Sequence, residues 1–293
     1  MLKKRYNTKA VVVIMTIIAL CIMGALYLIR NAYGYSRVYS IAIFAMVGII
    51  MIIYALSITR WREVDIIEQP CDYPPIGLNP LQTGCIVSGE VNNRDIISGF
   101  YYLAQKGYMT IREYELKRFE FTAIEFPKNE HDDIKMIYRA IFGAEGVDKP
   151  GTVVKLCDAS DRLIDVVPRI SQSTVKSIRH KRNKEIADLT GKVRGFRSSL
   201  IANKGDKAQA LLEKDPDYIF EILPYAYEFA ITAKIASNFA IDKMAAPSWY
   251  IPFGVDDDYI FDVLIYNSML RNMPEELRLL VFDEIGIRQR IGM

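Results

Sequence analysis

The segment NPLQTGCIVSGEVNNRDIISGFYYLAQKGYMTIREYELKRFEFTAI (Asn79–Ile124) decides the predicted fold of the central part of the chain. Asn79 caps the first free N–H groups of a helix and Pro80 suits its first position, so together they predict a helix start. Gly89 is expected to end this helix, because glycine readily adopts the left-handed conformation that closes many helices. A second helix follows, capped within Asn92–Asn93 and carrying apolar residues at helical spacing.

After Gly107, which closes the second helix, the pattern changes to two strands. Tyr108–Ile111 and Phe119–Ile124 flank a charged turn, Glu113–Arg118. Two helices followed by a two-stranded hairpin are the outline of a winged helix-turn-helix. The expected winged-helix-like domain, residues 60–156, is completed by a further helix and a short strand: Asn129–Phe142 and Thr152–Leu156.

This outline raises the alternative of DNA binding, in which the helix over residues 93–106 enters the major groove. The residues that we expect to be exposed on this helix are Arg94, Asp95, Ser98, Tyr102 and Gln105. Groove-binding helices usually carry several Arg or Lys residues. Here Arg94 is offset by Asp95, and residues 60–168 hold 13 basic against 18 acidic residues. A winged-helix fold that packs against protein is therefore favoured over one that binds DNA.

Two uncharged apolar runs near the N-terminus, Ala10–Ile29 and Val38–Thr59, predict a two-helix transmembrane hairpin over residues 1–59. Each run is about as long as a helix must be to cross a hydrocarbon core of roughly 30 Å. Neither contains Asp, Glu, Lys, Arg or His, which argues against transport. The alternative for the first run is a cleaved signal peptide, which would leave a single span.

Basic residues near the runs predict the orientation in the membrane. Four precede the first run, two lie in the connector and two follow the second run. Because basic residues favour the cytoplasmic side, we expect a multi-pass protein of the cell membrane with both termini in the cytoplasm. The lipid bilayer is then one expected partner.

The charge downstream of the runs is distributed unevenly. The first 59 residues hold six basic and no acidic residues, which leaves 31 basic and 35 acidic residues for the rest. That balance argues against a nucleic acid partner. Arg169–Lys207 departs from it with eleven basic and three acidic residues. We expect residues 157–207 to form a basic connector and favour a solvated helix face with a flexible connector. Contact of the cationic strip with anionic headgroups or a partner is the alternative. The expected contact residues are Lys176, Arg179, Lys181, Arg182 and Lys184.

No constellation of residues predicts catalysis. The four cysteines form no C-x-x-C pair, and His131 and His180 are the only histidines, which leaves little for a zinc site or a His-based triad. No acid pair has a spacing that predicts a shared site, and the glycines match no phosphate-binding loop. We therefore predict no catalytic residue, metal, cofactor or small-molecule substrate.

Residues 208–293 predict a second, mostly helical domain, which makes the fold class mainly helical α+β. Asp215–Asp217 starts a helix, and the apolar run that continues to Ala240 is predicted as a core helix rather than a third span. Pro247–Tyr250 is expected to be an aromatic loop. Asp256–Asp258 is expected to cap an amphipathic helix within Tyr259–Arg290 rather than to bind a cation.

Motifs in a fixed order give the chain a resemblance to a known family. They are YPPIGLNP (Tyr73–Pro80), NRDI (Asn93–Ile96), LAQKGYMTI (Leu103–Ile111), then Gly195-Phe196-Arg197, Leu223-Pro224-Tyr225-Ala226 and Trp249-Tyr250. Over roughly residues 73–250 the chain resembles the cytoplasmic part of predicted bacterial membrane proteins of the YciQ-like (DUF2207) family. The resemblance implies architecture and location and no biochemical activity. Family members usually begin with a secreted domain, and they often have Glu and Trp near the places of Lys204 and Ile235.

The later motifs are expected to be packing signatures. Gly195 permits close approach of another segment, Phe196 is buried, and Arg197 is expected to pair with a carboxylate such as Glu221 or Glu228. Tyr225 is expected to be a buried hydroxyl that needs a partner. The favoured function is a membrane-anchored cytoplasmic interaction module without enzymatic activity that binds protein partners or itself. The alternative is a membrane-tethered winged-helix DNA-binding regulator.

Overall fold

The structure is a computed structural model that describes residues 66–293 except 182, 240, 242–243, 256–258 and 292–293. The predicted membrane spans, Ala10–Ile29 and Val38–Thr59, lie outside the described residues, as does the predicted cap Asp256–Asp258. Among the helices that the structure describes, none is long and apolar enough to cross a bilayer. The described residues belong to one compact unit that includes all three segments predicted downstream of the membrane.

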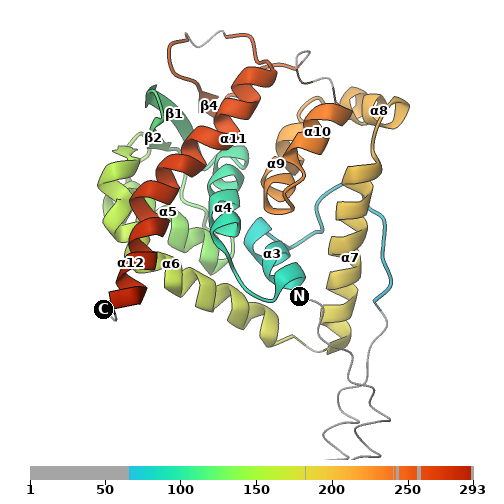
Figure 1. Cartoon of the computed structure of the whole chain (residues 1–293), viewed down its shortest axis with the longest axis horizontal. Helices are drawn as coiled ribbons and strands as arrows, with labels where there is room; N and C mark the ends of the chain where they lie inside the picture. Colours follow the sequence, from blue (N-terminus) through green and yellow to red (C-terminus); the bar gives the residue numbers. More distant parts are fainter. Residues whose placement is uncertain (1–65, 182, 240, 242–243, 256–258, 292–293) are drawn as a thin grey trace, which may run out of the picture. The chain divides into compact units, whose positions relative to one another are not determined.

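The unit is mainly helical with one small four-stranded sheet, as the predicted α+β class requires (Figure 1). Its elements in chain order are α3 (Pro80–Ser88), α4 (Asn93–Gln105), β1 (Met109–Glu115), β2 (Arg118–Ala123), α5 (Asp132–Asp148), β3 (Val153–Lys155), α6 (Leu156–Arg179), α7 (Asn183–Ala202), α8 (Asp206–Lys214), α9 (Tyr218–Glu228), α10 (Thr232–Asn238), β4 (Tyr250–Ile251), α11 (Val263–Leu277), the π-helical segment η2 (Arg278–Phe282) and α12 (Asp283–Ile291).

The helix starts and stops predicted around α3 and α4 are confirmed. Asn79 caps α3 through a reciprocal capping box with Gln82, and Gly89 closes the helix with φ of 83°. Asn92 caps α4. Gly107 then turns the chain with φ of 77° into β1. These local signals need only neighbouring residues, so they are readable without tertiary contacts.

The hairpin is confirmed and is longer than predicted. β1 pairs with β2 in antiparallel fashion from Met109 to Glu115. β3 joins the outer side of β2, and β4 joins β1 in parallel, giving the order β3-β2-β1-β4. The predicted loop at Trp249-Tyr250 thus contributes an edge strand, because Tyr250 lies beside Ile111.

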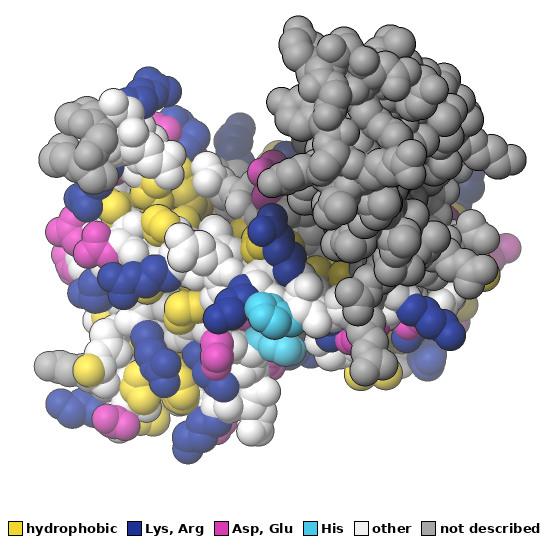
Figure 2. All heavy atoms as spheres, turned by 90° about the horizontal axis from the view of Figure 1, so that it is seen from below, with side chains coloured by type: hydrophobic (Ala, Val, Ile, Leu, Met, Phe, Trp, Pro, Cys, Tyr) yellow, Lys and Arg dark blue, Asp and Glu magenta, His cyan; other side chains and the backbone are white. Residues whose placement is uncertain are grey.

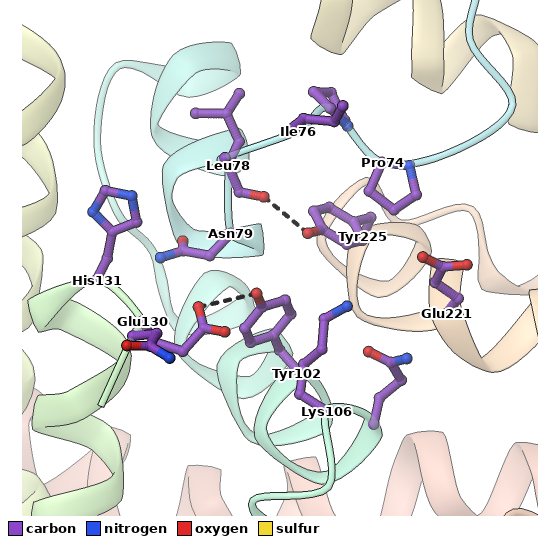
Figure 3. A pocket seen from close by; sticks show the side chains of 14 residues that line it. Pro74, Ile76, Leu78, Asn79, Tyr102, Lys106, Glu130, His131, Glu221 and Tyr225 are labelled. Atoms are coloured by element: carbon purple, nitrogen blue, oxygen red, sulfur yellow. Dashed lines mark hydrogen bonds between the residues drawn. The ribbon is translucent and has the colours of Figure 1, made fainter. Parts of the chain in front are cut away.

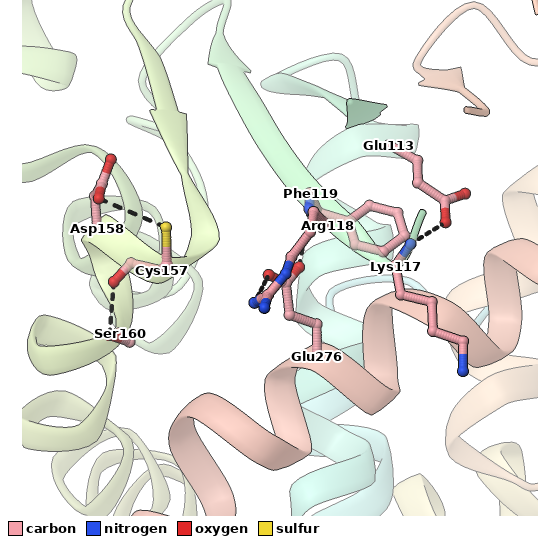
Figure 4. Close-up of polar contacts among 8 residues, drawn as sticks. All are labelled: Glu113, Lys117, Arg118, Phe119, Cys157, Asp158, Ser160 and Glu276. Atoms are coloured by element: carbon pink, nitrogen blue, oxygen red, sulfur yellow. Dashed lines mark hydrogen bonds and ion pairs between the residues drawn. The ribbon is translucent and has the colours of Figure 1, made fainter. Parts of the chain in front are cut away.

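Two buried carboxylates attach the turn of the hairpin to α11 (Figure 4). Glu276 accepts a 2.8 Å hydrogen bond from the Phe119 backbone N–H. The pairing of β2 with β3 begins at Glu120, so β3 offers no acceptor to Phe119. Glu113 accepts from the Lys117 backbone N–H at 2.7 Å and from the Asn272 side chain at 2.9 Å. The two carboxylates thus accept hydrogen bonds from backbone N–H groups at the turn, Lys117 and Phe119, in place of the carbonyl groups of a neighbouring strand.

The predicted basic connector is folded as two long helices, α6 and α7. Apolar side chains of α6, such as Leu163, Val167 and Ile170, recur at helical spacing and are buried. Val193 and Phe196 of α7 are fully buried as well. The basic residues lie on the outer faces of these helices. The net charge of the segment therefore did not reveal that both helices are amphipathic, with an apolar face in the core.

Helix α4 is the centre of the core, not an exposed recognition helix. It packs against α3, α5 and α9, and the Tyr101 hydroxyl donates to the Met269 carbonyl of α11 at 2.9 Å. Asp95, Ser98 and Tyr102, predicted to be exposed, are buried. The prediction was wrong because it considered only the neighbouring helices of a winged helix and left one side of α4 exposed. In the structure α9 and α11 cover that side.

The C-terminal helices are shorter than predicted. The run to Ala240 breaks between α9 and α10 at Ala230, which adopts a positive φ of 56°. The amphipathic segment within Tyr259–Arg290 is divided by η2, although Leu277 and Val281 are buried as expected.

Candidate functional site

Helix α7 binds the segment through which the chain enters the folded unit. The Gln69 backbone N–H donates to the Gly191 carbonyl at 3.1 Å, and the Gln69 side chain donates to Asp188 at 2.8 Å. A Cβ at Gly191 would overlap the Ile67 carbonyl, and one at Gly195 would overlap the Gln69 backbone. These two glycines lie one helical turn apart and have no side chain, so the backbone of residues 67–69 can lie directly on the helix. Figure 1 shows this entering segment beside α7.

The residues of the Gly-Phe-Arg motif have different roles: Gly195 contacts the entering segment, whereas Phe196 lies in the core. Gly195 permits the predicted close approach, and Phe196 is fully buried, with its ring centroid 5.7 Å from that of Tyr225. Arg197 is exposed, and it forms no ion pair with another residue in the described part of the chain. The predicted ion pair with Glu221 or Glu228 is therefore not formed, although the charge of Arg197 acts on Glu228 and lowers its pKa, against the larger effect of burial.

The motifs of α9 and β4 also serve packing. Leu223 and Pro224 are buried, and the Tyr225 hydroxyl donates to the Leu78 carbonyl at 2.9 Å, which confirms the predicted need for a partner. Trp249 and Tyr250 are buried. The structure therefore brings Phe196 and Tyr225 together and places Trp249-Tyr250 at the sheet edge.

The predicted contact residues of the basic stretch lie where α6 ends and α7 begins. Lys176, Arg179 and Lys184 are exposed, and Lys181 forms a 2.6 Å ion pair with Glu185. Arg182 lies outside the described residues. Seen from below, the molecule carries many Lys and Arg side chains on this face (Figure 2). The basic strip is thus an exposed helix face at a helix junction.

A pocket lies where α3, α4, α9 and the loop before α5 converge (Figure 3). Its volume is about 330 Å³. One wall is the stiff loop Pro74–Leu78, and the others carry aromatic and ionisable side chains: Tyr102, Lys106, Glu130, His131, Glu221 and Tyr225. The Tyr102 and Tyr108 hydroxyls each donate to Glu130 at 3.1 Å. Apart from the Tyr73-Pro74-Pro75 loop, no sequence pattern predicts this pocket, because its residues come from four separate segments.

Two buried carboxyl groups meet beside α3. Asp95 is inaccessible to solvent and Glu228 is 7 % exposed. A Cβ at Gly84 would overlap Asp95 and lie 2.9 Å from Glu228 Oε1, so both groups converge on the space that this glycine leaves. Among the residues that the structure describes, Asp95 Oδ1 and Glu228 Oε2 find no hydrogen-bond partner. Burial raises the pKa of Asp95 to about 7 and that of Glu228 to about 8. Sequence spacing did not predict this pair, since 133 positions separate the two residues.

In the described part of the chain, no group of three or more His, Cys, Asp or Glu side chains is arranged to hold a metal ion. Comparison with protein-family models, curated proteins and solved structures finds no match for this chain. The resemblance to the YciQ-like family stays a prediction.

Proposed function

We propose that this chain is a membrane-anchored interaction module without enzymatic activity that binds protein partners or a second copy of itself. In this proposal the residues before the folded unit are the anchor, and α3, α4 and the β1–β2 hairpin form a winged-helix-like unit used for packing. The folded unit lies on the cytoplasmic side, and its basic face at the α6–α7 junction lies toward anionic headgroups.

The attachment of residues 67–69 to α7 supports the anchoring role. Nine residues, and therefore ten steps along the chain, separate Gln69 from Thr59, the end of the second predicted span. At about 3.5 Å per extended residue, this tether reaches at most roughly 35 Å. In this proposal the chain length alone limits how far the bound segment can lie from the bilayer.

The observation that carries the interaction role is the exposure of Ile76. Its side chain is 102 % exposed, although two prolines precede it and a Pro75–Leu78 backbone hydrogen bond of 3.2 Å closes the turn. A stiffened loop thus holds a large apolar side chain in water beside a pocket. Burying such a side chain against a partner contributes about 1.5–3 kcal/mol, and the rigid loop loses little entropy on binding.

The burial of α4 argues against the DNA-binding alternative. A recognition helix must present several side chains to base edges. Asp95, Ser98 and Tyr102 face the core instead, and Arg94 is the only basic residue in the helix.

Affinity purification from solubilised membranes tests the proposal. We expect the full chain to recover a specific partner or to self-associate, and Ile76→Asp to lose that binding. Ile287→Asp is the matched control, because it changes an equally large, exposed side chain on α12. A full chain that is monomeric by analytical ultracentrifugation and recovers nothing sensitive to Ile76→Asp would refute the proposal.

A further inference from the structure

The pocket beside Ile76 has an excess of negative charge. Glu130 and Glu221 line it, Lys106 is its one Lys or Arg side chain, and His131 stands at its rim. In the described part of the chain, neither carboxylate has a Lys or Arg nitrogen within ion-pair distance. Partial burial raises the pKa of Glu221, and Lys106 opposes that effect only in part. The site therefore holds carboxylates that are partly desolvated and unpaired, which is unfavourable unless a cation binds.

Aromatic rings provide the second feature. The rings of Tyr102 and Tyr225 meet edge to face with centroids 6.4 Å apart. Lys106 places its ammonium 5.8 Å from the Tyr102 ring centroid, so the chain's own cation already lies over one face of the site. Tyrosine faces attract ammonium and guanidinium groups, and the attraction grows with desolvation.

The geometry of Glu130 fits a cation better than an anion. The Tyr102 and Tyr108 hydroxyls donate to Oε2 and Oε1 respectively, which fixes the carboxylate and leaves its remaining lone pairs free. The N-termini of α3 and α5 also point here, but Asp132 and Asp133 occupy the first turn of α5. Two carboxylates and an acidic helix start would repel a phosphate or carboxylate ligand.

We propose that this pocket receives a lysine or arginine side chain of the partner polypeptide, flanked in that partner by an apolar residue that covers Ile76. The inference rests on the proposed function, since it names the chemistry of the partner. The guanidinium or ammonium lies between Glu130 and Glu221 against the two tyrosine rings, and the aliphatic stem passes the Pro74–Leu78 loop.

Titration with small probes tests the site without a known partner. The full chain in detergent, labelled at isoleucine δ-methyl groups, is titrated with N-acetyl-arginine amide and with its neutral isostere N-acetyl-citrulline amide. We expect the Ile76 methyl resonance, assigned with Ile76→Val, to shift with a Kd on the order of 1 mM for the arginine probe. The citrulline probe should bind about fivefold more weakly, since one ion pair at a partly exposed site changes affinity by about that factor.

Three variants sharpen the test. Glu221→Gln should weaken the arginine probe about fivefold, and Glu115→Gln, at the exposed end of β1, should not change it. Lys106→Met should strengthen binding at least twofold, because it removes the competing cation. Equal binding of both probes, no shift at 50 mM arginine probe, or a phosphate-induced shift that Lys106→Met abolishes would overturn the inference. Probe binding without a recovered partner would instead count against the proposed function alone.

Discussion

We expect Asp95→Asn to stabilise the protein above pH 8 and to stabilise it much less at pH 5. Asp95 and Glu228 are buried side by side over Gly84, and one oxygen of each has no hydrogen-bond partner within the described part of the chain. Asn retains an oxygen that can accept the 2.7 Å hydrogen bond from the Asn92 backbone N–H. Its amide can also donate toward Glu228, which no group in the wild-type site does.

The magnitude follows from the raised pKa values. Burial raises the pKa of Asp95 from 3.8 to about 7, against weaker opposing effects of the Asn92 backbone hydrogen bond and of Arg94. Burial and the neighbouring Asp95 raise the pKa of Glu228 from 4.5 to about 8. The folded state therefore binds more protons than the unfolded state between about pH 4 and pH 8, so the free energy of unfolding falls as pH rises. Three pKa units for Asp95 correspond to about 4 kcal/mol. Because Asn cannot ionise, we expect the variant to exceed wild type by about 2–4 kcal/mol at pH 9.

Urea unfolding of the full chain in detergent at pH 5, 7 and 9 measures this difference. Trp249 is buried and reports unfolding by fluorescence in a Trp61→Phe background. Glu115→Gln, which removes an exposed carboxyl group, is the control and should follow wild type at every pH. A wild-type stability that stays constant or rises from pH 5 to pH 9 would refute the reasoning, as would an Asn variant that is less stable throughout.

Two further substitutions probe the contacts of α7 and α9. Gly195→Ala should push the Gln69 backbone off α7 at a cost of about 1–3 kcal/mol, which faster hydrogen exchange of the Gln69 amide would reveal. Arg194→Ala, at an exposed position of the same helix, should leave that exchange unchanged. Tyr225→Phe should leave the buried Leu78 carbonyl unsatisfied and cost about 1–3 kcal/mol in chemical unfolding, and an unchanged stability would contradict that role.

Part of the fold was predictable because its signals are local. Asn79-Pro80, Gly89 and Asn92 define helix ends through groups within four residues, and the structure places those ends where the sequence predicts. The buried roles of Phe196 and Tyr225 were likewise predictable, since large aromatic side chains in apolar surroundings are strongly favoured in a core.

The sequence by itself determined the mainly helical class, the hairpin and the packing roles of the later motifs. Only the tertiary structure decided which side of α4 is covered, because α9 and α11 come from more than 100 residues away. The same holds for the meeting of Asp95 with Glu228 and for the pocket beside Ile76. Local patterns fix the conformation of a segment, whereas burial and pairing depend on which distant segments pack beside it.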